Sequence, residues 1–162
     1  MKMMLKRTGV FFLAICMMFA LTACGEEKEK EYKENFLAAV SEMKTVKAEF
    51  NAAADALFGG NSIREEDKQA LLDAITKLRE AYAKFGSLEA PEKYKDVQTL
   101  FNEGIESAQK ALEIYETEIG TLSDDTLNEE ALERLQEGDK LIQQASDKIA
   151  EGAKMGVELD EK

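Results

Sequence analysis

Apolar residues recur at helical spacing through most of the chain after residue 31. In the first such segment they fall three or four positions apart, at Tyr32, Phe36, Ala39, Met43, Val46, Phe50, Ala53 and Leu57. This spacing places the side chains on one face of a helix, with the character of a heptad seam. Gly59 and Gly60 follow, and because glycine has poor helix propensity, they should end this helix.

The same spacing predicts a second helix before Gly86, with its apolar face formed by Leu71, Ile75, Leu78, Tyr82 and Phe85. Ser62 and Glu65 have the Ser-x-x-Glu spacing of a capping box, in which a side chain and a backbone N–H satisfy each other at a helix start. We therefore expect this helix to be capped by Ser62 and to end at Gly86, a residue suited to a C-terminal cap.

Two further amphipathic helices complete the pattern. Pro91 suits the first position of a third helix, where its missing N–H costs nothing, and the seam contains Tyr94, Val97, Phe101, Gly104, Ala108, Ala111 and Tyr115. Thr126 and Glu129 form a second capping box, which predicts a fourth helix that ends near Gly156. Its seam contains Ala131, Leu135, Gly138, Ile142, Ala145, Ile149 and Gly152.

Four amphipathic helices joined by short loops predict an all-α protein, an antiparallel up-down-up-down four-helix bundle over residues 32–157 with an acidic tail at 158–162. Two alternatives remain: a three-helix arrangement in which the second helix docks only partly, and an elongated hairpin that dimerises. Small residues alternate with large ones on the first, third and fourth seams. We expect these helices to approach more closely than the usual 8 to 10 Å somewhere along their length.

The first 23 residues have the order of a secretory signal: basic residues, an apolar run from Val10 to Leu21, and small residues before Cys24. The run is shorter than the about 20 apolar residues that span a bilayer. Leu21-Thr22-Ala23-Cys24 resembles the lipobox of bacterial lipoproteins. The resemblance implies diacylglyceryl transfer to the Cys24 thiol, cleavage after Ala23, and an extracytoplasmic protein anchored by lipid to the outer face of the cell membrane.

Together with the predicted helices, the lipobox makes the chain similar to small, uncharacterised helical lipoproteins of Gram-positive bacteria. Residues 24–31 would then form a lipidated, charged tether that keeps the domain close to the membrane. The alternatives are a plain transmembrane anchor and a secreted protein whose cysteine is incidental.

The composition of the chain limits the kinds of partner that it can bind. The chain has 33 acidic and 21 basic residues, and loss of the signal removes Lys2, Lys6 and Arg7, which leaves a net charge of −15. Nucleic acid is excluded as a partner because binding phosphate needs a basic surface. A protein partner with a positive patch is expected instead.

The chain has no histidine, which removes the usual general base, most nucleophile pairs and most zinc sites.

Leu100 and Ile114 stand off the main seam of the third helix, two heptads apart. They predict a surplus apolar strip that receives a partner helix. The alternative is that both residues are buried because this helix contacts two neighbours.

The acidic turn at residues 123–130 could supply oxygen ligands to a hard cation, with Asp124, Asp125 and Glu129 as the candidates. The EF-hand spacing is broken, however, and capping together with the helix dipole already explains acidic residues in a first turn.

The seam tyrosines are consistent with a pocket for an apolar ligand or a haem-like cofactor, but also with an ordinary core.

The favoured function is a non-enzymatic, lipid-anchored protein-interaction or accessory module at the membrane surface. No metal or cofactor is predicted. The alternative is a lipoprotein that binds a small ligand or a cation in the bundle core or at the acidic turn.

Overall fold

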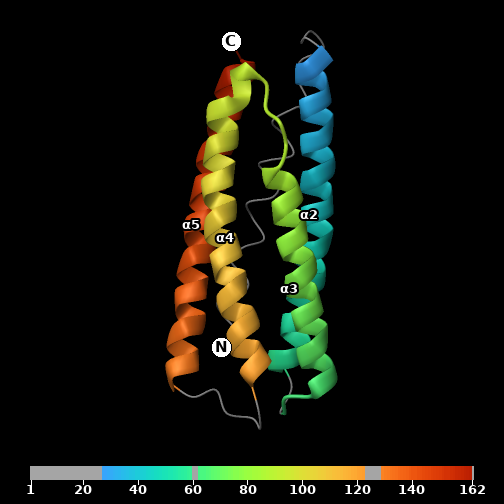
Figure 1. Ribbon diagram of the computed structural model, residues 1–162, viewed down its shortest axis with the longest axis vertical. Coiled ribbons are helices and arrows are strands. Elements are labelled where there is room, and N and C mark those ends of the chain that lie inside the picture. The colour runs from blue at the N-terminus through green and yellow to red at the C-terminus, as the bar shows by residue number, and fades with distance from the viewer. Residues whose placement is uncertain (1–26, 60–61, 123–128, 162) are drawn as a thin grey trace.

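The computed structural model describes residues 27–59, 62–122 and 129–161, and four long helices make up most of this part of the chain. These helices are α2 (Glu27–Gly59), α3 (Glu65–Gly86), α4 (Lys95–Thr121) and α5 (Glu129–Asp160), and a short 3-10 helix, η2 (Glu92–Tyr94), leads into α4. Successive helices run in opposite directions, so the start of α2 and the end of α5 lie at the same end of the molecule (Figure 1). The predicted antiparallel four-helix bundle is confirmed.

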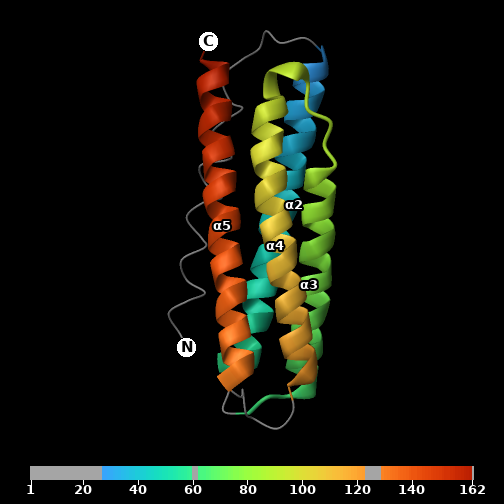
Figure 2. The same ribbon diagram turned by 60° about the vertical axis from the view of Figure 1, so that its left-hand side comes forward.

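Helix α4 lies between α3 and α5, and α2 packs on α3 (Figure 2). The interior between the helices is filled by the predicted seams. Phe36, Phe101 and Leu112 are fully buried, and Phe36 of α2 contacts Phe101 of α4 across the bundle with a centroid distance of 5.3 Å. Burial of these large side chains is the main stabilising contribution, at about 1.5–3 kcal/mol for each.

Both ends of the helical region extend beyond the sequence prediction. Helix α2 begins at Glu27, inside the segment 24–31 that was expected to be a tether, and α5 continues to Asp160, inside the expected tail. Glu27 and Glu29 in the first turn of α2 interact favourably with the positive end of the helix dipole. The end of α5 is held by side-chain contacts described below.

The predicted cap of α3 was wrong. The helix starts at Glu65, its N-cap is Arg64, and no side chain caps the backbone there. Instead, the guanidinium of Arg64 forks onto the carboxylate of Asp67, with Nε 2.6 Å from Oδ2 and Nη2 2.8 Å from Oδ1. This local bidentate pair joins the N-cap residue to the first turn of the helix through side chains and does not cap the backbone.

Pro91 lies one residue before η2 rather than at the first position of α4. Its carbonyl accepts the backbone N–H of Tyr94 at 2.8 Å, which closes the 3-10 turn. As a result the ring of Tyr94 turns into the core, where it is fully buried. None of the described helices is long and apolar enough to cross a membrane.

Candidate functional site

Several residues singled out from the sequence lie outside the described part of the chain: the lipobox with Cys24, Gly60, Asp124, Asp125 and the predicted cap Thr126. Glu129 is described, and it is exposed in the first turn of α5. Over the described ranges, no group of three or more histidine, cysteine, aspartate or glutamate residues is placed to hold a metal ion. The cation site at the acidic turn therefore stays a prediction.

Leu100 and Ile114 are half-buried on α4, and neither belongs to the connected core cluster. Leu100 faces α5, because a Cβ added at Gly152 would lie 3.2 Å from the Cβ of Leu100. The strip is therefore part of the α4–α5 junction and is neither a fully exposed surface nor core.

Helices α4 and α5 approach each other closely along glycine positions, as the alternation of small and large residues predicted. A Cβ added at Gly104 would lie 2.9 Å from the backbone carbonyl oxygen of Ala145, and one added at Gly138 would lie 2.7 Å from Cε1 of Tyr115. Real Cβ contacts are longer than this. Glycine at 104 therefore lets the two backbones come near each other, and glycine at 138 leaves room for the ring of Tyr115.

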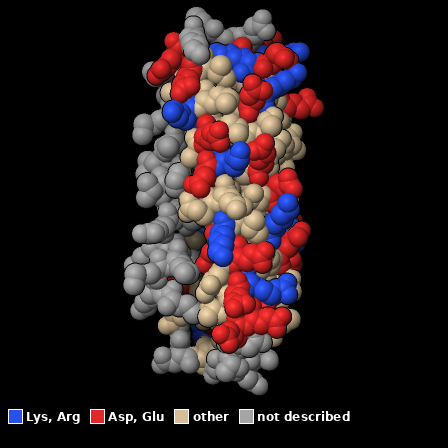
Figure 3. All heavy atoms as spheres, turned by 90° about the vertical axis from the view of Figure 1, so that its left-hand side faces the viewer, with Lys and Arg blue, Asp and Glu red and all other residues tan. Residues whose placement is uncertain are grey.

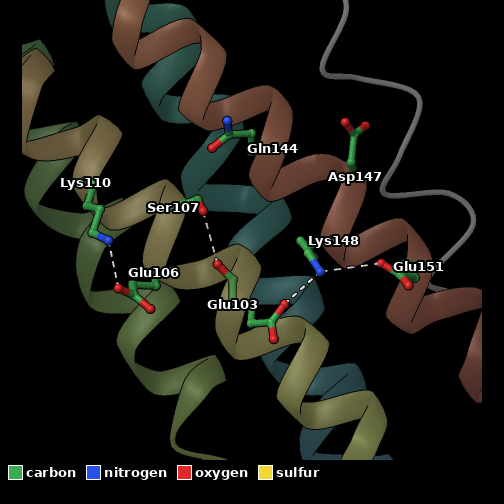
Figure 4. A pocket seen from close by; sticks show the side chains of 8 residues that line it. All are labelled: Glu103, Glu106, Ser107, Lys110, Gln144, Asp147, Lys148 and Glu151. Atoms are coloured by element: carbon green, nitrogen blue, oxygen red, sulfur yellow. Dashed lines mark hydrogen bonds and ion pairs between the residues drawn. The ribbon is translucent and has the colours of Figure 1, made fainter.

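Above this close approach an open groove of about 500 Å³ runs between the outer edges of α4 and α5 (Figure 4). We call it the α4–α5 groove. Four of its lining residues come from α4 and four from α5, and all carry polar or charged side chains: Glu103, Glu106, Ser107, Lys110, Gln144, Asp147, Lys148 and Glu151.

Both lysines of the α4–α5 groove are engaged with carboxylates. Lys148 Nζ lies 2.8 Å from Glu103 and 3.8 Å from Glu151, and Lys110 Nζ lies 2.8 Å from Glu106. The hydrogen bond from Lys110 and its charge lower the pKa of the Glu106 carboxyl, so this group is ionised at neutral pH. These pairs are exposed, and exposed pairs are weak and exchange readily with other ions.

Asp147 differs from the other carboxylates of the α4–α5 groove. It accepts a hydrogen bond from Nε2 of Gln143 at 2.8 Å, but within the described ranges no lysine or arginine nitrogen lies within 4.0 Å of it. Its carboxylate is exposed. The groove can therefore attract a cationic group without a net loss of existing ion pairs.

A second polar cluster, which we call the end cluster, joins the start of α2, the turn η2 and the end of α5. Its centre is the carboxylate of Asp160, whose side chain is 7% exposed. Tyr94 donates its hydroxyl proton to this carboxylate, and Lys33 Nζ and Lys93 Nζ lie 3.0 and 3.5 Å from it. Both ammonium groups also sit over the ring of Tyr94, at 5.4 and 5.3 Å from the centroid.

The end cluster is suited to holding structure rather than to proton transfer. Burial, and then the hydrogen bond to Asp160, raise the pKa of the Tyr94 hydroxyl well above its ordinary value. It therefore remains a protonated donor at physiological pH. The ring of Tyr94 stacks on Tyr32 with a centroid distance of 5.6 Å, and the hydroxyl of Tyr32 donates to Oε1 of buried Gln98 at 2.8 Å.

The sequence indicated Tyr32 and Tyr94 as seam residues but gave no signal for the end cluster. Asp160 was assigned to the tail, and nothing in the sequence distinguishes Lys33 from a lysine exposed to solvent. The tyrosine rings pack as ordinary core residues, and Tyr115 stacks on Phe50 at 6.3 Å while its hydroxyl donates to Asp139 at 2.7 Å.

Fold and surface together define an acidic, antiparallel helical-bundle protein. The chain belongs to the family described as a domain of unknown function (DUF7018), whose match covers residues 26–146. No curated protein and no solved structure matches the chain.

Proposed function

We propose that the protein is a bacterial lipoprotein, held by acyl chains on Cys24 at the outer face of the cell membrane, and that it binds a protein partner there and catalyses no reaction. One observation carries this proposal. The lipobox Leu21-Thr22-Ala23-Cys24 ends only three positions before Glu27, the first residue of α2.

This short separation would fix how the bundle stands on the membrane. Three residues reach at most about 11 Å, so the end of the bundle that contains the end cluster would lie near the lipid headgroups. The opposite end would project outward by the length of α2, about 50 Å at 1.5 Å per residue. Two long acyl chains, at about 0.8 kcal/mol per buried CH₂, suffice to hold such a domain on the membrane.

The charge of the outer surface of the bundle supports a binding role. Acidic side chains are spread along the length of the face on the α4–α5 side, with lysines, arginines and uncharged residues between them (Figure 3). Such a surface attracts a partner of opposite charge and speeds its association.

The anchor is tested by Cys24→Ala, with Cys16→Ala as the matched control because Cys16 lies inside the expected signal. Cells that make each variant are fed labelled palmitate. We expect Cys24→Ala to lose the label and to keep the size of the precursor, and Cys16→Ala to be labelled and processed like the parent. Equal labelling of Cys24→Ala and the parent would contradict the lipoprotein assignment.

The partner role is tested with a photo-crosslinking residue placed, one at a time, at exposed positions of all four helices in the full chain, in the cells that make it. A binding module should give at least one discrete crosslinked protein from one face. If no position on any helix gives a discrete product, the partner-binding role is wrong.

A further inference from the structure

We propose that the α4–α5 groove is the surface that receives the partner, and that it receives an amphipathic segment that carries lysine or arginine side chains. This inference rests on the partner-binding role proposed above. It adds the place of contact and the chemistry of what is bound.

Negative charge is concentrated on the two helices that form the α4–α5 groove. Helices α4 and α5 together carry fifteen acidic and six basic residues, whereas α2 and α3 carry twelve and nine. The excess of acidic residues is thus nine on one half of the bundle and three on the other. A basic segment is therefore attracted to the α4–α5 half, whereas an anionic lipid surface or a nucleic acid is repelled by it.

Apolar side chains lie beside the charged ones at the α4–α5 groove. Leu100 and Ile114 stand seven positions before and after Ser107, so the three share one stripe of α4 with Ser107 at the centre. All three are half-buried, and neither Leu100 nor Ile114 belongs to the core cluster. The two apolar side chains are thus partly exposed on the stripe that contains Ser107, one on each side of it.

Helix α5 contributes a third apolar residue of the same kind. Arg134 pairs with Glu118 at 2.8 Å and Lys148 pairs with Glu103 at 2.8 Å. Leu141 stands midway between Arg134 and Lys148, seven positions from each, so it shares one stripe of α5 with them. It is also half-buried and outside the core cluster. A partner helix laid along the groove would meet leucine and isoleucine side chains as well as carboxylates.

The shape of the α4–α5 groove suits a long cationic side chain. The two backbones come close together at Gly104 and Ala145, and the groove is lined by polar and charged side chains, with Glu106 on α4 and Asp147 on α5 (Figure 4). A lysine or arginine stem can lie along such a groove with its charged end near these carboxylates. Asp147 offers an acceptor, and the exposed pair of Glu106 with Lys110 can exchange.

The test uses the full chain in the cells that make it, with benzoylphenylalanine as the crosslinking probe in place of Gln144, which lines the groove. A matched probe replaces Thr76, which is exposed on α3. Each probe is combined with the groove pair Glu106→Lys and Asp147→Lys, or with the control pair Asp55→Lys and Glu80→Lys. The control residues are exposed on α2 and α3, so both pairs change the net charge equally. Equal thermal melting of both pairs after purification verifies that the fold is kept.

We expect the Gln144 probe to give a discrete crosslinked protein, whose yield falls at least tenfold in the groove pair and stays within twofold in the control pair. Mass spectrometry should place the crosslink in a segment with two or more lysine or arginine residues within ten positions. A crosslink from the Thr76 probe but not from the Gln144 probe would overturn the groove and leave the partner role standing.

Each remaining outcome of the crosslinking experiment also tests the proposal. Equal loss of yield in both pairs would mean that total charge, not the groove, attracts the partner. A crosslinked segment without basic residues, or an adduct with lipid, would show that the occupant is wrong. Absence of crosslinks from both probes, while probes on α2 or elsewhere on α3 give one, would overturn the groove alone. Absence from every position would contradict the proposed function as well.

Discussion

The hydroxyl of Tyr94 donates a hydrogen bond to the carboxylate of Asp160, and this contact joins the turn before α4 to the last residue of α5. The two residues are 66 positions apart. Lys33, from the second turn of α2, reaches the same carboxylate. Three segments of the chain are therefore held at one nearly buried anion. A buried carboxylate is tolerated only when it is paired and hydrogen-bonded in this way.

Removal of this carboxylate should destabilise the bundle measurably. Asp160→Ala takes away an acceptor that three donors share, and loss of a buried partner costs about 1–3 kcal/mol. Urea unfolding should show a lower midpoint with an unchanged slope. Asp55→Ala, at an exposed position of α2, is the control and should change stability by less than about 0.5 kcal/mol. Equal midpoints for the two variants would mean that the end cluster does not hold α5.

The close approach of α4 and α5 gives a second prediction, on Gly104. Gly104→Ala places a methyl group against the backbone oxygen of Ala145, an atom that cannot move aside without a shift of the helix. The cost should be about 1–3 kcal/mol, as for other overpacked sites. In contrast, Gly120→Ala meets no atom within 4 Å, so the better helix propensity of alanine should stabilise by up to about 1 kcal/mol. Thermal melting of both variants checks the order.

Should Gly104→Ala melt at the same temperature as the parent, the two helices must be farther apart than the structure places them. Gly138→Leu offers an independent check, because its side chain would meet the ring of Tyr115. The Gly138→Leu substitution should also destabilise the bundle.

The helices and their order followed from the sequence because apolar spacing is a local signal that the core then uses directly. Phe36 and Phe101 were assigned to seams of the bundle, and both are buried. The exact helix starts were less predictable. Ser62 had the correct spacing for a cap, but the helix starts at Glu65 with Arg64 as its N-cap, and nothing in the sequence distinguishes the two starts.

The candidate sites were predictable only in part. Leu100 and Ile114 stood out as apolar residues off the seam, but their half-buried state depends on how closely α5 lies, which the glycines decide. The end cluster depends on Asp160 meeting Tyr94, a contact between distant segments. No local pattern predicts such a pair, because an acidic residue near a chain end is usually solvated.

The tyrosines give a prediction on alkaline pH. The chain has four. Burial raises the pKa of Tyr82 to about 12 and raises the pKa values of Tyr32, Tyr94 and Tyr115 further above the ordinary 10.0. In the unfolded chain they ionise near 10. Because the folded pKa values are the higher ones, their contribution to stability is complete below pH 10 and is lost as the pH rises above it.

This can be measured by absorbance at 295 nm, which reports ionised tyrosine. The folded protein should show little ionisation between pH 10 and 11, whereas the same protein in concentrated urea should titrate near pH 10. The urea midpoint should also fall between pH 10 and 12. Four tyrosines that ionise near pH 10 while circular dichroism still shows native helix would contradict their burial.

Substitutions of apolar residues by glutamate at three depths test where the strip of Leu100 and Ile114 lies. Leu132 is 38% exposed and Leu112 is fully buried, so Leu132→Glu should change stability by no more than about 0.5 kcal/mol and Leu112→Glu should unfold the domain, at a cost above about 4 kcal/mol. The double variant Leu100→Glu with Ile114→Glu should lie between, with a cost of about 1–3 kcal/mol, because each half-buried carboxylate keeps part of its hydration. Urea midpoints place the three variants in order. A double variant as stable as Leu132→Glu would put both side chains in solvent, whereas a double variant that unfolds would put them in the core, and either result would remove them from the groove surface.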